Sequence, residues 1–334
     1  MIVHPPDPKD AGYRAMKTLV DNIIAADRRI KAVEGGVRET PLDLSAIFSE
    51  RTGAGFLLKG EHLQRTGSFK MRGAMNKILC LTEQQRNQGI ITASSGNHGM
   101  ATALAARIGA TDVTIYVPES VSPLKLSNMK RLGADTILVP GNGVAAEITG
   151  RAAAEREGKT FVSPYSDLEI IAGQGTVGLE LAEQCPDLAA VYVCVGGGGL
   201  IAGIATCIKL QNPEIRIIGV EPEDSAAMRD SLAAGKPVTL DHVGLFADGV
   251  AVRKVGEETF RLCKEYVDEM ITVDTDQCCA AIRDIFEDTR SIVEPAGGLA
   301  IAGVKKYTAE NNVAGQSFVT INGGANINFD RLRH

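Results

Sequence analysis

Short apolar runs alternate with longer amphipathic or alanine-rich stretches along most of this chain. Apolar runs bounded by glycine or proline predict β-strands, and apolar residues three or four positions apart predict α-helices. We expect strands at residues 55–60, 89–93, 113–117, 136–139, 161–162, 190–195, 215–220 and 317–321, and helices at 21–37, 100–108, 125–132, 144–156, 176–184, 200–210, 257–266, 276–288 and 297–307. Residues 1–20 are expected to form a loose polar arm. The alternation predicts an α/β fold with βαβ units and parallel sheets.

Size, composition and charge narrow the possible functions. A chain of 334 residues with 44% hydrophobic residues is long enough for one or two domains with a sizeable core. The net charge of −6, with both signs interspersed, argues against nucleic-acid binding and offers no basic face to a membrane. There is no apolar run long enough to span a bilayer and no signal-peptide pattern, so we expect a cytoplasmic protein. Seven cysteines without metal-ligand spacing indicate reduced thiols and no metal site.

Lys70 stands between a turn-prone Thr-Gly-Ser at residues 66–68 and a helix-forming run. The positive end of a helix dipole disfavours the charged form of an amine in the first turn, and burial in a closed pocket has the same effect. Both effects lower the pKa of a lysine, as a nucleophilic or proton-transferring lysine requires. A surface lysine at a helix N-terminus is an equally good interpretation of this stretch alone.

Four consecutive glycines at residues 196–199 separate a predicted strand from a predicted helix. They let the backbone approach a ligand closely with several N–H groups at the positive end of the helix, which is typical of a phosphate site. Gly197, Gly199 and Ala202, with Glu221 after the next strand, also fit a dinucleotide fingerprint loosely, so a nicotinamide or flavin enzyme is an alternative. A glycine turn with a purely structural role is another.

Three further turns follow predicted strands or precede predicted helices. Residues 94–98, Ser-Ser-Gly-Asn-His, offer hydroxyl and N–H groups to a carboxylate, although a serine N-cap is the simpler interpretation. His98 is better interpreted as a structural hydrogen-bonding residue than as a base. Residues 294–298 and 322–326 are glycine-containing turns. One lysine, a phosphate cradle and these turns together indicate pyridoxal phosphate, whose aldehyde suits the amine and whose phosphate suits the cradle.

These motifs together resemble the fold-type II pyridoxal-phosphate enzymes, and within them the threonine/serine dehydratases. The matching stretches are residues 66–70, 94–99, 172–176, 196–199, 246–252 and 294–297, and the resemblance extends from about residue 25 onward. Residues 244–252, 258–263 and 324–329 are most similar to the biosynthetic threonine dehydratases. The resemblance implies two parallel-sheet αβα domains. A smaller, mobile domain at residues 75–165 would be inserted in a larger cofactor-binding domain at residues 1–74 and 166–334.

The resemblance also implies a role for each matching residue. Lys70 would form the Schiff base with the cofactor and remove the α-proton of the substrate. Phe69 would lie beside the cofactor ring, and Asn97 would hydrogen-bond the 3′-oxygen of that ring. The other cofactor-binding residues would be Gly196, Gly197, Gly198 and Gly199, which hold the phosphate, together with Leu200, Glu294 and Gly323. The substrate-binding residues would be Ser94, Ser95, Gly96, Asn97 and His98, with Ser95 as a second catalytic candidate.

The chain departs from the family pattern at three places. The family usually has a serine at the position of Gly323, where its hydroxyl meets the pyridine nitrogen. Either Asn322 or a water replaces that hydroxyl here, or the nitrogen is left without a partner. Ser95 matches the second acid/base of serine racemases, whereas biosynthetic dehydratases tend to have alanine there, so some racemase activity is expected. Glu221 matches a cation ligand of the racemase branch, but Ser225 and Ala227 do not repeat its carboxylates, so no metal is predicted.

The resemblance favours a dehydratase that converts L-threonine to 2-oxobutyrate and ammonia, also acts on L-serine, and belongs to isoleucine biosynthesis. It implies a homodimer or homotetramer. The alternatives are a serine racemase, a dehydratase of another β-hydroxy amino acid such as hydroxyaspartate or phenylserine, a nicotinamide-dependent oxidoreductase and a non-enzymatic binding module. The chain ends at His334, where biosynthetic enzymes continue into a regulatory domain, so we expect no isoleucine feedback on this chain.

Overall fold

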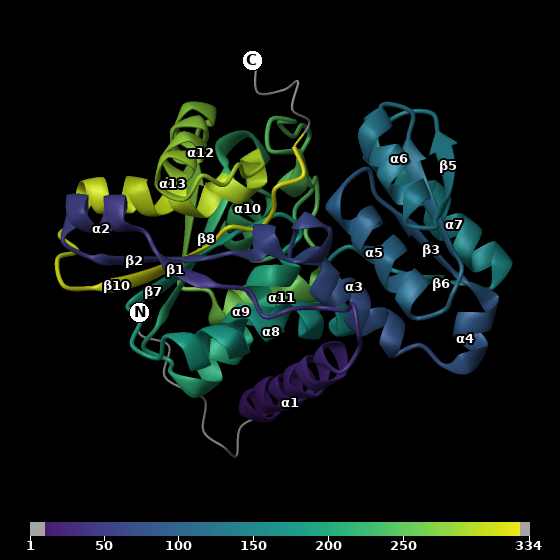
Figure 1. Cartoon of the computed structure of the whole chain (residues 1–334), viewed down its shortest axis with the longest axis horizontal. Helices are drawn as coiled ribbons and strands as arrows, with labels where there is room; N and C mark the ends of the chain where they lie inside the picture. Colours follow the sequence, from purple (N-terminus) through teal and green to yellow (C-terminus); the bar gives the residue numbers. More distant parts are fainter. Residues whose placement is uncertain (1–10, 328–334) are drawn as a thin grey trace.

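The computed structural model describes residues 11–327 and contains two β-sheets, each covered by helices (Figure 1). The larger sheet has six strands in the order β1-β2-β10-β7-β8-β9. Its strands are β1 (Leu42–Leu44), β2 (Gly55–Lys59), β7 (Ala190–Cys194), β8 (Arg216–Pro222), β9 (Glu269–Val273) and β10 (Ser317–Ile321). Only β1 pairs antiparallel, at one edge of this sheet. All five residues of β7 are buried, as a parallel strand covered on both faces requires.

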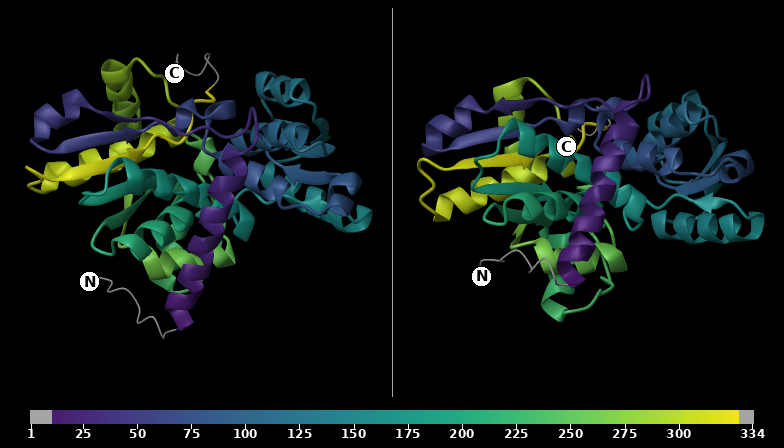
Figure 2. Two further views of the ribbon diagram at one scale, coloured as in Figure 1. Left: turned by 60° about the horizontal axis from the view of Figure 1, so that its bottom comes forward. Right: turned by 90° about the horizontal axis from the view of Figure 1, so that it is seen from below.

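Helices cover both faces of the larger sheet. In Figure 1, α2, α12 and α13 lie on one side of it, and α8, α9, α11 and α1 lie on the other. The helices of this part are α1 (Ala11–Lys31), α2 (Ala46–Thr52), α3 (Lys70–Leu79), α8 (Leu168–Gln184), α9 (Gly199–Gln211), α10 (Ala227–Ala234), α11 (Glu257–Tyr266), α12 (Thr275–Thr289) and α13 (Pro295–Glu310), with short 3-10 turns η1 (Glu61–Leu63), η2 (Arg65–Gly67), η3 (Glu223–Ser225) and η4 (Asp248–Val250). Figure 2 shows α1 running along the outside, where it packs on α8 and α9.

The smaller sheet is fully parallel and has four strands in the order β5-β4-β3-β6. Its elements are α4 (Glu83–Gln88), β3 (Ile90–Ala93), α5 (Asn97–Ile108), β4 (Val113–Pro118), α6 (Pro123–Arg131), β5 (Asp135–Val139), α7 (Gly143–Glu157) and β6 (Thr160–Phe161). All of them come between β2 and β7 in the sequence, and they pack around two apolar clusters, one of which also takes in residues of α1, α3 and α8. The predicted α/β class with parallel sheets is therefore confirmed, while the boundaries at residues 75 and 165 stay a prediction.

Two predicted helices have different bounds in the structure. The first helix covers residues 11–31 and not 21–37, because Met16, Leu19 and Ile23 form a buried stripe at helical spacing that packs on the larger lobe. Part of the predicted N-terminal arm is therefore helical, and its residues 1–10 lie outside the described part. Helix α8 begins at residue 168 and not 176, since Asp167 accepts N–H bonds as its N-cap. Among residues 11–327, no helix is both long and apolar enough to cross a bilayer.

Candidate active site

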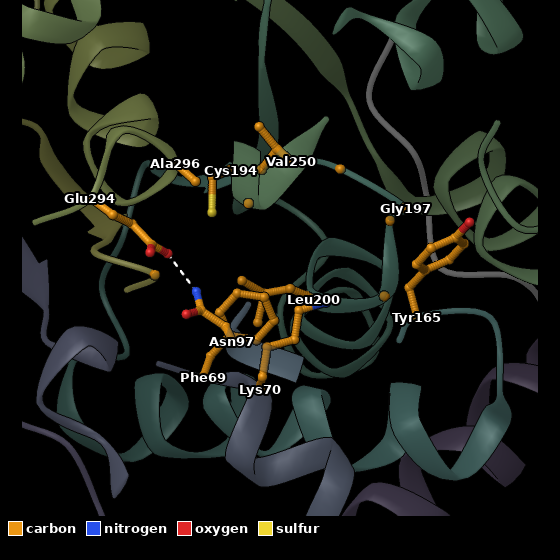
Figure 3. Close-up of a pocket in the computed structure, with 15 residues that line it drawn as sticks. Phe69, Lys70, Asn97, Tyr165, Cys194, Gly197, Leu200, Val250, Glu294 and Ala296 are labelled. Carbon is orange, nitrogen blue, oxygen red and sulfur yellow. Dashed lines mark hydrogen bonds between the residues drawn. The ribbon is translucent and has the colours of Figure 1, made fainter. Parts of the chain in front are cut away.

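A pocket of about 480 Å³ lies where the carboxyl ends of β7 and β10 meet the first turns of α3, α5, α9 and α13 (Figure 3). Crevices at the carboxyl ends of parallel strands are the usual ligand sites of open α/β sheets. The pocket is lined by Phe69, Lys70, Asn97, Tyr165, Cys194, Gly196, Gly197, Gly198, Gly199, Leu200, Gly249, Val250, Glu294, Ala296 and Gly323. Every residue that we expected to bind a cofactor is in this list, so the fold brings them to one place.

Lys70 is the first residue of α3, and a sharp turn delivers the chain to it. Thr66 and Gly67 both have positive φ, 59° and 72°, and such a conformation is unusual for a β-branched residue. Lys70 Nζ donates a hydrogen bond to the carbonyl oxygen of Pro164 at 2.9 Å. Burial lowers the pKa of Lys70 to about 8, although the acidic groups of Cys194 and Glu294 partly oppose this shift. About a tenth of the amine is therefore neutral at pH 7, far more than for a lysine with the usual pKa of 10.5.

The four glycines after β7 form a cradle that leaves no room for side chains. A Cβ atom on Gly197 would lie 2.1 Å from Tyr165 Cγ, and one on Gly199 would lie 2.9 Å from the carbonyl oxygen of Tyr165. Gly198 has a φ of 92° and precedes α9 without any side-chain cap. The first N–H groups of a helix have no partner within it, so this end of α9 is available to an anion.

Asn97 connects two parts of the pocket. Its Nδ2 donates to Glu294 Oε1 at 2.5 Å (Figure 3), and its Oδ1 accepts from Asn326 Nδ2 at 2.8 Å. Asn97 begins α5 of the smaller sheet, whereas Glu294 is the N-cap of α13 beside the larger sheet. Burial raises the pKa of Glu294 to about 7, although the hydrogen bond from Asn97 lowers it in part. The amide of Asn97 is thus held in one orientation at the mouth between the two sheets.

Four of the expected substrate-binding residues do not line this pocket. Ser94, Ser95 and Gly96 form the partly exposed loop before α5, and Ser94 Oγ accepts a bond from the Gly96 N–H. His98 is buried, and its Nε2 lies 3.2 Å from the carbonyl oxygen of Val162. Burial and the charge of Lys70 lower the pKa of His98 to about 3. This placement favours the structural interpretation of the imidazole.

The sequence did not point to five of the pocket residues as ligands, namely Tyr165, Cys194, Gly249, Val250 and Ala296. Three of them lie in stretches that resemble the family, residues 246–252 and 294–297, so a signal existed for them. Cys194 lies in a predicted strand and Tyr165 follows a short one, and neither residue type nor spacing marks them. They become neighbours of the cradle only through the packing of distant segments.

Glu221 is placed away from the pocket. Its carboxylate accepts N–H bonds from Met228 and Arg229 at 2.8 and 2.9 Å, at the start of α10. Its oxygens are therefore engaged by the backbone and are not directed at a nucleotide ribose beside the glycines. Within the part of the chain that the structure describes, no three His, Cys, Asp or Glu side chains gather as a metal site would require.

Residues 33–324 match the family model described as "Pyridoxal-phosphate dependent enzyme". The L-threonine dehydratase biosynthetic IlvA of Pasteurella multocida is 44% identical over 88% of this chain, and threonine dehydratase 1 biosynthetic, chloroplastic, of Solanum lycopersicum is 48% identical over 88%. The chain spans 58% and 49% of the lengths of these two relatives.

Two solved structures are similar over nearly all of the chain. The processed form of threonine deaminase isoform 2 from Solanum lycopersicum has a TM-score of 0.92 at 37% identity. The match covers 100% of this chain and 95% of the tomato protein's chain. Maize serine racemase has a TM-score of 0.88 at 32% identity, and the match covers 94% of this chain and 95% of the racemase chain. These matches exclude the nicotinamide alternative, and the engaged carboxylate of Glu221 agrees. The chain belongs to the pyridoxal-phosphate dependent enzymes of fold type II.

Proposed function

We propose that this chain is a threonine/serine dehydratase that converts L-threonine to 2-oxobutyrate and ammonia. The observation that carries the proposal is a single pocket that contains both a lysine of lowered pKa and four consecutive glycines, residues 196–199, at a helix N-terminus. The relatives that are 44% and 48% identical bear threonine dehydratase names and support the choice of reaction.

The residues present suit pyridoxal phosphate. The cradle at residues 196–199 has room only for backbone N–H groups and a ligand, as a phosphate ester requires. Lys70 supplies an amine that is partly neutral and can therefore attack an aldehyde. Phe69 offers an aromatic face and Asn97 an amide beside it. When bound, the cofactor supplies a conjugated ring that stabilises negative charge developing at the α-carbon of an amino acid.

Each side chain of the site then has a defined task. Lys70 would hold the cofactor aldehyde and would accept the α-proton of the substrate, since an amine with a pKa near 8 is a competent general base near neutral pH. The loop at residues 94–96 and the first N–H groups of α5 bind the substrate carboxylate, because the positive end of a twelve-residue helix favours an anion. Asn97 is held between Glu294 and Asn326, so its amide would keep the cofactor ring in one orientation.

A keto-acid assay on the purified protein with pyridoxal phosphate tests this proposal. L-threonine, L-serine, D-serine and threo-3-hydroxyaspartate would be supplied separately, and the remaining amino acid would be checked for chirality. We expect fast 2-oxobutyrate from L-threonine and pyruvate from L-serine. Lys70→Ala should abolish turnover, and a Lys70→Ala enzyme with near-normal turnover would refute the assignment. Keto acid from threo-3-hydroxyaspartate alone would move the enzyme to another β-hydroxy amino acid.

Serine racemization is a second candidate activity, and Ser95 favours it. Its hydroxyl makes no hydrogen bond to another residue in the range 11–327, so it is available to a substrate at the start of α5. Slow keto-acid formation with D-serine appearing from L-serine would support this candidate. Ser95→Ala should then abolish D-serine formation, whereas a pure dehydratase would form no D-serine before or after that change.

We also propose a homodimer or homotetramer, a biosynthetic role in isoleucine formation and a cytoplasmic location for the chain. The biosynthetic names of the bacterial relatives support the second of these. Light scattering after size-exclusion chromatography would measure the assembly, and a monomer at micromolar concentration would contradict it.

A further inference from the structure

Among residues 11–327, Cys194 is the one pocket residue whose polar side-chain atom makes no hydrogen bond to another residue. The Lys70 amine donates to Pro164, the Asn97 amide is shared between Glu294 and Asn326, and the hydroxyl of Tyr165 donates to the Lys254 carbonyl oxygen. Cys194 is 6% exposed, and its sulfur points into the pocket from the wall that faces Phe69, Lys70 and Asn97 (Figure 3). A buried polar atom aimed into a ligand site is expected to meet a ligand atom.

The thiol occupies the space next to Gly323. Cys194 ends β7 and Gly323 follows β10, and these two strands are parallel neighbours, so the two residues emerge side by side at the same sheet edge. A Cβ atom on Gly323 would lie only 3.1 Å from Cys194 Sγ. A side chain at position 323 and a thiol at position 194 therefore compete for the same volume. The other candidate named from the sequence, Asn322, is buried but does not line the pocket.

The chemistry of the cofactor defines what the thiol meets. In pyridoxal phosphate the ring nitrogen is para to the carbon that carries the aldehyde, so a ring whose aldehyde reaches Lys70 directs its nitrogen to the opposite wall. Cys194 lies across the pocket from Lys70 (Figure 3), and Gly323 is its neighbour. We propose that the Cys194 thiol donates the hydrogen bond to the pyridine nitrogen in this chain, in place of a side chain at position 323. The proposal rests on the family's cofactor and not on the substrate proposed above.

The thiol has the protonation state that this role needs. Burial raises the pKa of Cys194 to about 12, and the nearby carboxyl of Glu294 raises it further. The sulfur therefore keeps its proton across the physiological range and acts as a neutral donor. A thiol is a weak donor, so the ring nitrogen accepts this bond without becoming protonated. Cys194 is on this view a cofactor-positioning residue that also fixes the electronic state of the ring.

Nitrogen-15 NMR of the holoenzyme loaded with ring-¹⁵N pyridoxal phosphate tests the proposal without any substrate. Cys194→Ala should move the ring-nitrogen resonance toward that of a free unprotonated pyridine and raise the cofactor Kd about three- to tenfold. Cys194→Ser, which keeps a donor at this position, should retain the hydrogen-bonded resonance. Cys263→Ala is the matched control, because Cys263 is fully buried outside the pocket, and it should change neither quantity.

A second pair of variants tests the competition for space. Gly323→Ser alone should weaken cofactor binding, because its side chain meets the sulfur. Cys194→Ala/Gly323→Ser should restore the hydrogen-bonded resonance. A Cys194→Ala holoenzyme with the wild-type resonance would overturn the proposal. If Cys194→Ala does not fold, the double variant decides, and a free-pyridine resonance there would overturn it. If the resonances shift as expected but the wild-type enzyme does not turn over L-threonine, only the proposed substrate is refuted.

Discussion

At the scale of single residues, the decisive property of the site is the state of one amine. The amine of Lys70 is buried, and this desolvation lowers its pKa to about 8 from the usual 10.5 of a lysine. The position of Lys70 at a predicted helix N-terminus already suggested a lowered pKa, and the structure adds its burial in the pocket. The charge that Lys70 loses near neutral pH is the condition for both cofactor capture and proton transfer.

We expect the apoenzyme to capture pyridoxal phosphate with a pH dependence set by this pKa. Only the neutral amine attacks an aldehyde, so the capture rate should rise as pH increases and level off above about 8. Stopped-flow absorbance of cofactor uptake between pH 6 and pH 10 would measure it, with Lys70→Ala as the control that shows no covalent uptake. A rate that still rises tenfold per pH unit above pH 9 would show an unperturbed lysine instead.

Single residues also show where sequence reasoning ends. Lys70, Asn97 and Glu294 stood in turns whose composition suggested a ligand, and the structure places all three in the pocket. Cys194 and Tyr165 stood in ordinary strand and loop contexts, so nothing local distinguished them. Their positions depend on which strand ends become neighbours, which is a property of the sheet order and not of a local motif.

At the scale of elements, the cradle depends on the close packing of residues 196–199 against the loop that carries Tyr165. We expect Gly197→Ala to weaken cofactor binding more than about tenfold, because the new methyl would lie 2.1 Å from Tyr165 Cγ and overpacking of this kind is costly. Titration of the apoenzyme with pyridoxal phosphate would measure the Kd.

Gly143→Ala is the matched control for this change. A Cβ atom on Gly143 would meet nothing within 4 Å, and Gly143 lies in the first turn of α7, far from the pocket residues. It should leave the Kd within about twofold of the wild type, since it introduces no overpacking. Equal affinities of the two variants would show that the cradle tolerates a side chain at residue 197.

The helix that carries Lys70 is anchored by a buried ion network. Arg72, two residues after Lys70, pairs with Glu61 and Glu180 at 2.7 Å each, and Lys59 pairs with Glu180 at 2.6 Å. The side chains of all four residues are 0% exposed. Because the network links η1, β2 and α8 to α3, it fixes the start of α3 relative to the larger sheet.

Arg72→Met should lower the free energy of unfolding by about 3–5 kcal/mol, because it leaves Glu61 and Glu180 buried with Lys59 as their one remaining counter-charge in the network. Urea unfolding of the wild type and the variant would measure the change. Arg261→Met removes an arginine from exposed pairs with Glu258 and Glu265 and should cost less than about 1 kcal/mol. Similar losses in the two variants would mean that the buried network adds no special stability.

At the scale of the whole molecule, the alternating pattern was sufficient for the fold class, whereas the arrangement in two sheets was predicted only through the family resemblance. Alternating strands and helices predicted parallel sheets, because each apolar run is short and each helix is long enough for a crossover. Nothing local indicated that the four strands of the smaller sheet would leave the larger one. That separation follows from packing, since the strands of the two sheets are buried in different apolar clusters.

An ion pair links the two parts of the molecule beside the pocket, and its contribution can be tested directly. Lys125 of α6 pairs with Asp248 of η4 at 3.0 Å, with side chains 14% and 37% exposed. This pair joins the smaller lobe to the larger one beside Glu294, whose pKa both charges influence. If the lobes close over a substrate, the pair favours the closed arrangement by the modest amount typical of a partly exposed ion pair.

Lys125→Met should therefore raise the KM for L-threonine about two- to fivefold, with kcat within about twofold of the wild type. Asp248→Asn should have a similar effect, and the double variant should be no worse than either single one, because the two residues act through one interaction. High salt should raise the wild-type KM toward that of the variants by screening the pair. Additive effects in the double variant, or a KM of Lys125→Met that responds to salt as the wild type does, would show that the lobes do not close through this contact.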